Sequence, residues 1–131
     1  MAVALILSFV LLVIAALHVL WGIGYWFPIR DEAALVRAVV GAAGQSKMPG
    51  AVPCAFVAVA LLFALMCLWW PPGQLRSWIL AVIGVVFGTR GGATYTALWR
   101  RWTPVEPFAR LDRTYYGPLC LLIGSGFLAS I

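Results

Sequence analysis

The chain contains long apolar segments without a formal charge, and these constrain its fold more than any other feature. Residues 2–26 read AVALILSFVLLVIAALHVLWGIGYW and residues 51–70 read AVPCAFVAVALLFALMCLWW. About 20 mainly apolar residues suffice for a helix to cross a lipid bilayer. Only 10% of all residues are charged, whereas soluble domains carry about 25%. We therefore predict an integral membrane protein rather than a water-soluble one.

Two further segments have the length of a membrane span. Residues 75–99 begin LRSWILAVIGVVFG and then meet Arg90 and a double glycine, which can bend the helix. Residues 115–131 number about 17, the lower limit for a span. The short connections favour a four-helix up-and-down bundle. The prediction is an all-α, single-domain chain over residues 1–131, with spans at about 2–26, 51–70, 75–99 and 115–131.

A cleaved signal peptide is the alternative interpretation of the first segment. Such a peptide has a basic n-region, a short apolar stretch and a small-residue cleavage site. Residues 2–26 contain no Lys or Arg, are longer than the usual apolar stretch and are not followed by an A-x-A site. The sequence therefore favours a retained membrane span.

Basic residues lie almost wholly on one side of this predicted bundle. The loops at 27–50 and 100–114 together carry seven Lys and Arg, whereas Arg76 is alone on the other side. An excess of this kind marks cytoplasmic loops. Both termini are therefore expected outside the cytoplasm. The net charge of +5 includes no run of like charges, so nucleic acid is not an expected partner.

The first of these loops contains a helical pattern. Asp31 and Glu32 suit the start of a helix, where acids interact favourably with the helix dipole. The apolar residues after them share one face, and they are Leu35, Val36, Val39 and Val40. The pattern predicts a short helix lying on the membrane surface. A solvated turn is the alternative.

No metal or cofactor is expected from the sequence. Cys54, Cys67 and Cys120 lack the CxxC spacing of metal or redox sites and fall in predicted spans, where they indicate small packing residues. His18 is the only histidine, which excludes a haem held between two histidines.

Two ionisable residues fall at membrane depth, where a charge is costly and usually functional. His18 lies eight residues before Trp26, and Arg90 lies nine residues before Trp99. Since their helices run in opposite directions, the two side chains are expected at the same depth. His18, Trp21, Gly22 and Tyr25 follow helical i, i+3, i+4, i+7 spacing. They predict one face with an aromatic wall and a titratable group.

The third span has a ridge of small residues. Gly84, Gly88 and Gly92 repeat every four residues, and Tyr95 continues the line. Small residues at this spacing allow close packing between membrane helices. Arg90 projects away from the ridge in a regular helix, so it can instead extend toward the cytoplasmic interface.

The segment before the fourth span has a polar pattern. Asp112 is placed to cap the fourth helix, and Pro118 falls in the first turn of that helix, where proline is tolerated. A pair between Asp112 and either Arg90 or Arg113 would tie this loop across the bundle. Tyr115 suits the membrane interface.

The chain resembles a family of small bacterial four-span membrane proteins, the three-nine-nine-five family of domains of unknown function. The resemblance rests on three blocks: H-x-x-W-x-x-G in the first span, arginine and glycine in the third, and FA-x-x-D-x-x-Y-Y-x-P-L-C before the fourth. It covers nearly the whole chain, and the last block is its most specific part. The residues concerned are His18, Trp21, Gly24, Arg90, Gly91, Phe108, Ala109, Asp112, Tyr115, Tyr116, Pro118, Leu119 and Cys120.

The resemblance implies a four-span protein of the bacterial inner membrane and assigns no activity. At position 117 this chain has glycine where the family usually has serine, so a hydroxyl that belongs to the family pattern is missing here.

The leading hypothesis for function is binding, with transport as an extension of it. A pocket within the bundle, open to the cytoplasm, would hold a small amphipathic or anionic molecule. Arg90 would pair with a negative group, and His18 would titrate near neutral pH. The candidate ligand-binding residues are His18, Trp21, Tyr25, Arg90, Tyr95, Asp112 and Tyr115.

Two alternatives come from other classes. A membrane enzyme would use His18 as acid or base with Asp112 as orienting partner, although no nucleophile motif, metal set or cofactor fingerprint accompanies them. An accessory subunit would pack its glycine ridge against a larger membrane protein or a second copy of the chain. The expected partners are thus the lipid bilayer, a small amphipathic ligand and a membrane protein or homo-oligomer.

Overall fold

The computed structural model describes all 131 residues and is all-α, as predicted, without a β-strand. Three long helices are α1 (Ala2–Gly22), α3 (Ala51–Leu68) and α4 (Gln74–Ala93). A fourth continuous helix comprises α6 (Phe108–Leu111), the π-helical turn η1 (Asp112–Tyr116) and α7 (Gly117–Leu128). Two short helices, α2 (Glu32–Val39) and α5 (Ala97–Trp102), lie in the connections. Of these helices, α1 and α3 are long and apolar enough to cross a membrane.

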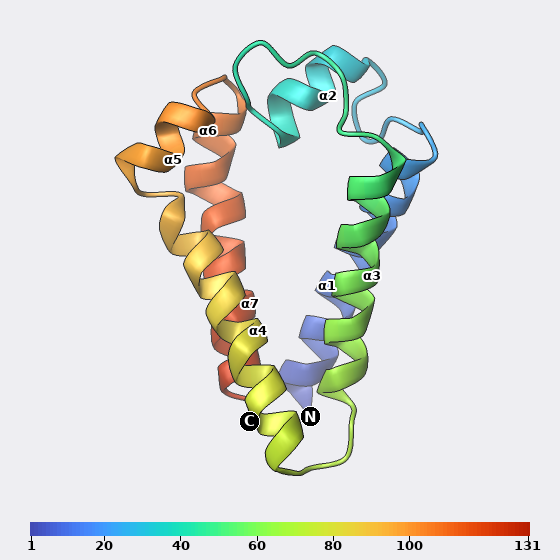
Figure 1. Ribbon diagram of the computed structural model, residues 1–131, viewed down its shortest axis with the longest axis vertical. Helices are drawn as coiled ribbons and strands as arrows, with labels where there is room; N and C mark the ends of the chain where they lie inside the picture. Colours follow the sequence, from blue (N-terminus) through green and yellow to red (C-terminus); the bar gives the residue numbers. More distant parts are fainter.

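The long helices form two antiparallel pairs. α1 packs on α3, and α4 packs on α7. Figure 1 shows that the pairs meet at the end where both termini lie and diverge toward the opposite end, where α2, α5 and α6 lie. The two loops that the sequence assigns to one side therefore do lie together.

Glycines bring α4 and α7 into direct backbone contact. A Cβ atom at Gly124 would lie 2.8 Å from the carbonyl oxygen of Gly84 and 2.9 Å from the amide nitrogen of Gly88. A Cβ at Gly91 would lie 2.8 Å from the carbonyl oxygen of Gly117. The ridge predicted on the third span is thus a packing face, with one correction. Gly91 belongs to it, whereas a Cβ at Gly88 or at Gly92 would meet nothing within 4 Å, and Gly88 approaches α7 through its backbone only.

The end where the two pairs meet holds the main apolar core. Leu11, Leu80 and Phe127 are fully buried there. Arg76, at the start of α4, reinforces this end because its guanidinium donates hydrogen bonds to the carbonyl oxygens of Leu68 and Ser130, each at 3.0 Å. One side chain thus links the C-terminal ends of α3 and α7.

The diverging ends of the pairs are joined through the last turn of α2 and the loop after it. The Tyr116 hydroxyl donates a hydrogen bond to the carbonyl oxygen of Ala38 at 3.0 Å, and the amide of Val105 donates one to the carbonyl oxygen of Gly41 at 3.2 Å. Gly41 has a φ of +70°, and the ring of Phe108 occupies the place where its Cβ would be. This crossing contact needs glycine for both reasons.

Most of the helical surface is apolar and uncovered. Only 27 of the 131 residues are buried, and large side chains such as Phe56 and Leu122 are 76% and 70% exposed. Such side chains occur on all four long helices. An apolar surface of this extent marks contact with lipid or with another protein.

The helix boundaries differ from the predicted ones at three places. α1 ends at Gly22 and α4 ends at Ala93, each followed by a turn rather than by further helix. The last helix begins at Phe108 and is therefore longer than the sequence predicts. The helix predicted in the first loop is present as α2, and Asp31 caps it by accepting a hydrogen bond from the amide of Ala34 at 3.1 Å.

Candidate functional site

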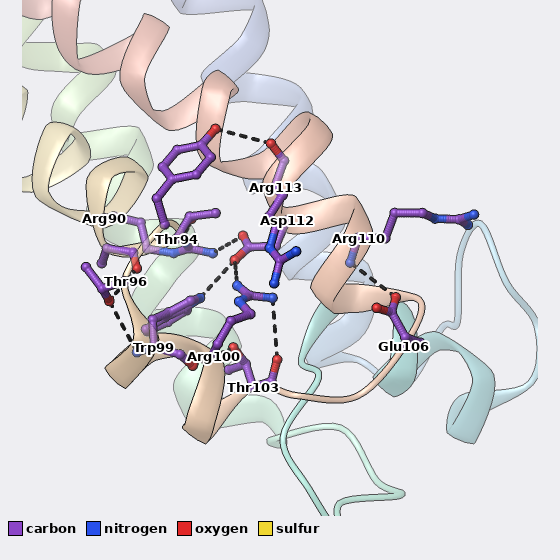
Figure 2. Close-up of polar contacts among 12 residues, drawn as sticks. Arg90, Thr94, Thr96, Trp99, Arg100, Thr103, Glu106, Arg110, Asp112 and Arg113 are labelled. Atoms are coloured by element: carbon purple, nitrogen blue, oxygen red, sulfur yellow. Dashed lines mark hydrogen bonds and ion pairs between the residues drawn. The ribbon is translucent and has the colours of Figure 1, made fainter.

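A fully buried carboxylate, Asp112, is the centre of the most polar cluster in the chain. Its Oδ1 accepts a hydrogen bond from Arg90 Nη2 at 2.8 Å. Its Oδ2 accepts one from Trp99 Nε1 at 2.8 Å and another from Arg100 Nη2. Figure 2 shows these three side chains pointing toward Asp112 from α4 and α5. Of the two arginine pairs that the sequence predicts for Asp112, the one with Arg90 is confirmed.

Arg90 is held by three contacts. Besides the bond to Asp112, its Nη1 donates to Thr94 Oγ1 at 2.8 Å, and its guanidinium lies 4.5 Å from the centre of the Trp99 ring. Thr94 is fully buried, whereas the Arg90 side chain remains 32% exposed. The guanidinium is therefore fixed in direction and still accessible.

The local sequence explains why Trp99 and Arg100 fold back onto Asp112. α4 stops at Ala93, and Thr96 then begins a new helix by accepting a hydrogen bond from the amide of Trp99 at 3.3 Å. This N-cap starts α5 at an angle to α4. The sequence prediction treats residues 75–99 as one span and therefore misses the return of Trp99 and Arg100 toward Asp112. Thr96 is a favourable N-cap residue, and this signal could have indicated that a new helix starts there.

Asp112 is not an N-cap, contrary to the prediction. It is the first residue of the π-helical turn inside a continuous helix, and the amide of Gly117 donates to its carbonyl oxygen. The turn widens the helix where Pro118, which has no N–H, leaves an acceptor unused. The freed carbonyl oxygen of Arg113 accepts a hydrogen bond from the Tyr95 hydroxyl at 3.1 Å. The irregular helix is thus held in place by α4 and the turn after it.

The charges in this cluster do not cancel. Two guanidinium groups face one carboxylate, and their side chains are 32% and 15% exposed for Arg90 and Arg100. Burial by itself would raise the pKa of Asp112, but the hydrogen bonds from Arg90, Trp99 and Arg100 and the charge of Arg90 together lower that pKa below its ordinary value. Asp112 precedes the expected fourth span at residues 115–131. The cluster therefore contains a firmly ionised acid and a surplus positive charge.

Acid should destabilise the fold through Asp112. A carboxyl whose pKa is lowered by folding contributes stability above its unfolded pKa, and this contribution is lost as the pH falls through the folded pKa. We expect the thermal unfolding temperature in detergent to fall steeply below about pH 4. In Asp112→Asn this steep part of the pH profile should be absent. If the unfolding temperature fell equally steeply with pH in the wild type and in Asp112→Asn, the acid sensitivity would not come from Asp112.

The residues predicted on the first span form a second, separate group. His18 Nδ1 lies 2.8 Å from the carbonyl oxygen of Ile14, and its ring centre lies 5.0 Å from that of Trp21. The Trp21 indole donates to the carbonyl oxygen of Phe27 at 2.8 Å, and Tyr25 lies under the guanidinium of Arg30 at 5.4 Å. No hydrogen bond joins His18 to Asp112 or Arg90. The predicted site is thus divided between the two helix pairs.

The remaining predicted residues lie beside the Asp112 cluster. Tyr95 is 57% exposed and Tyr115 is 62% exposed. No group of three or more His, Cys, Asp and Glu side chains is arranged to hold a metal ion. The sequence prediction omits Thr94, Trp99, Arg100 and Tyr116, which build the cluster and its link to α2.

The chain matches a known protein family over most of its length. Residues 11–127 match the family described as a protein of unknown function, DUF3995. The resemblance drawn from the sequence blocks is therefore confirmed over nearly the whole chain. No curated protein and no solved structure matches.

Proposed function

The chain belongs to the DUF3995 family of unknown function, and we propose that it is a four-span membrane protein that binds a small anionic amphipathic molecule at its basic end. Transport of that molecule would be an extension of this function. The proposal has two parts, a membrane placement and a binding site, and they rest on different observations.

The membrane placement is supported by the uncovered apolar surface. The four long helices expose large apolar side chains over more surface than a soluble monomeric protein usually leaves in contact with water. Seven of the eight Lys and Arg outside Arg90 lie at the end where the helix pairs diverge. By the positive-inside rule this end faces the cytoplasm. α2 then lies at that surface, but its apolar residues Leu35 and Val36 are buried within the protein rather than turned toward lipid, contrary to the prediction for this helix. Both termini face away from the cytoplasm.

The binding site is supported chiefly by the surplus charge at Asp112. Asp112 uses both oxygens on protein donors, so its role is to hold the arginines rather than to contact a ligand. The exposed part of the Arg90 guanidinium is the natural contact for an anionic group. The exposed rings of Tyr95 and Tyr115 supply apolar surface beside it.

The position of His18 near the end of α1 supports a binding site at the same end of the molecule. Because the carbonyl oxygen of Ile14 can only accept, His18 donates from Nδ1, and Nε2 of the neutral ring remains free as an acceptor. Tyr25, which is 44% exposed, adds aromatic surface on that side, whereas Trp21 is buried.

Neither alternative function is favoured by a specific contact. The enzyme hypothesis needs His18 to be oriented by an acid, and the His18 ring is instead bonded to its own helix. The accessory-subunit hypothesis needs a glycine ridge that is free along its length, and Gly84 is already covered by Leu128 and Gly124 of α7.

Arg90→Ala should abolish stabilisation by an anionic amphiphile. In neutral detergent, octyl phosphate at 100 times its Kd should stabilise the wild-type chain by about 2.7 kcal/mol, measured as a shift in thermal unfolding. Octyl glucoside, which has the same alkyl chain and no charge, should give no comparable shift. The variant starts from a lower unfolding temperature, so the shift is compared within each protein.

Arg101→Ala is the matched control because Arg101 is an exposed arginine at the same end. It should keep the octyl phosphate shift. Full retention of the shift in Arg90→Ala would overturn the proposed site. Equal loss of the shift in Arg90→Ala and Arg101→Ala would also overturn it, because net charge alone would then explain the stabilisation.

A further inference from the structure

An open hollow of about 620 Å³ lies at the start of the last helix, next in sequence to Asp112. It is lined by Glu106, Pro107, Arg110, Arg113 and Thr114. Arg110, Arg113 and Thr114 have i, i+3, i+4 spacing, so they form one face of the helix across α6 and η1. None of these residues belongs to the proposed site at Arg90.

The polar groups in the hollow are largely unused by the protein. The side chains of Arg110 and Arg113 make no hydrogen bond or ion pair, and Figure 2 shows Arg110 extending away from the Asp112 cluster. The Thr114 hydroxyl also lacks a partner, whereas Ser8 and Ser125 each donate to the carbonyl oxygen four residues earlier. Glu106 uses Oε2 to accept a hydrogen bond from the amide of Arg110 at 3.2 Å. The hollow therefore offers two free guanidinium groups, a free hydroxyl and one carboxylate.

We propose that this hollow binds the headgroup of an anionic phospholipid, with the phosphate held by Arg110 and Arg113. This inference rests on the membrane placement proposed above, which puts the hollow at the cytoplasmic surface of the bilayer. Guanidinium groups bind phosphate oxygens through paired hydrogen bonds. The Thr114 hydroxyl is a third donor, and the free oxygen of Glu106 accepts from a headgroup hydroxyl, as in a phosphatidylglycerol.

The surroundings of the hollow favour a lipid over a soluble phosphate compound. Tyr115 comes directly after Thr114 and is 62% exposed, as expected of an aromatic residue at the membrane interface. The same helix continues as α7, where Leu121 and Leu122 are exposed. A phospholipid with its headgroup in the hollow can thus lay its acyl chains along α7. A water-soluble phosphate would leave that surface uncovered.

Lipid retention by the purified full-length chain tests the proposal. Native mass spectrometry from neutral detergent gives an apparent Kd for dioleoylphosphatidylglycerol, with dioleoylphosphatidylcholine as the comparison lipid. We take about 1 kcal/mol, or about fivefold in affinity, for each basic side chain in direct contact with the anionic headgroup. The double variant Arg110→Gln with Arg113→Gln should therefore weaken phosphatidylglycerol binding by more than about tenfold and leave phosphatidylcholine binding unchanged.

The matched control is Arg37→Gln with Arg101→Gln, which removes two exposed arginines at the same end and outside the hollow. It should change the Kd by less than a factor of two. Equal weakening in both double variants would overturn the proposal, because net charge alone would then explain the binding. Glycerol 3-phosphate competing as strongly as the lipid would also overturn it, in favour of a soluble phosphate compound.

The two proposals fail in different ways. Failure of the membrane placement would appear as a chain that is recovered from cell membranes by alkaline carbonate without detergent. Failure of the Arg90 site would appear as a retained octyl phosphate shift in Arg90→Ala. Neither result depends on Arg110 or Arg113, so the phospholipid site is judged by its own pair of variants.

Discussion

Asp112→Asn is expected to lower the free energy of unfolding by about 3–5 kcal/mol, the largest effect of any conservative substitution in the chain. The carboxylate is fully buried and accepts hydrogen bonds from Arg90, Trp99 and Arg100. Asparagine has nearly the same shape but carries no charge and cannot accept at both positions. Two guanidinium groups would then face each other without a counter-ion. Thermal or denaturant unfolding in detergent measures the loss.

A second substitution should recover part of that loss. In Asp112→Asn with Arg100→Gln, one of the two uncompensated charges is removed, so the double variant should be more stable than the sum of the single changes predicts. Glu106→Gln is the control, because Glu106 is exposed and bonded only to a backbone amide. A loss below about 1 kcal/mol in Asp112→Asn would place this residue among ordinary surface ion pairs and contradict its central role.

Gly124→Ala is expected to separate α4 from α7. The added Cβ would lie 2.8 Å from the carbonyl oxygen of Gly84 and 2.9 Å from the amide nitrogen of Gly88, and backbone atoms cannot rotate aside as a side chain can. The helices must move apart along their whole contact, including the contact at Gly91. Overpacking of this kind costs about 1–3 kcal/mol and occasionally more. We expect the upper end of that range, measured as a fall in unfolding temperature.

Gly92→Ala is the control for this effect. It makes the same chemical change on α4, and its Cβ would meet nothing within 4 Å. Because alanine favours a helix over glycine by about 1 kcal/mol, this variant should be as stable as the wild type or slightly more so. If Gly124→Ala and Gly92→Ala behaved alike, the close backbone contact between α4 and α7 would be refuted.

Hydrophobic patterning was sufficient to predict the main helices and the helix in the first loop. Those elements are determined by local composition, and Asp31 shows the cap that the sequence indicates. The pairing of Arg90 with Asp112 could also be anticipated, because an ionised residue at depth requires a partner of opposite charge. These inferences needed no knowledge of how the helices are arranged.

The features of the structure that the sequence did not predict depend on small angular differences along a helix and on packing between segments. A regular helix returns to within about 20° of its starting direction after seven residues, so Gly91 rather than Gly92 continues the face of Gly84. The assignment of Asp112 as a cap failed because the helix begins four residues earlier, at Phe108. Nothing in the apolar pattern indicates the π-helical turn or the return of Trp99 and Arg100 from α5. These features arise from packing between segments.

The division into two antiparallel pairs implies an order of biogenesis. α1 and α3 can already contact each other before α4 has left the ribosome, and the turn containing Pro71 and Pro72 separates them from the second pair. Each pair has the form of a helical hairpin, and on the membrane placement proposed above such a hairpin can enter the bilayer as one unit. The second hairpin is then completed by glycine contacts of its own, and the ties made by Arg76 and Tyr116 form last. On the membrane placement proposed above, ribosome-stalled chains just long enough for α3 to have left the ribosomal exit tunnel should therefore already hold their first hairpin in the membrane.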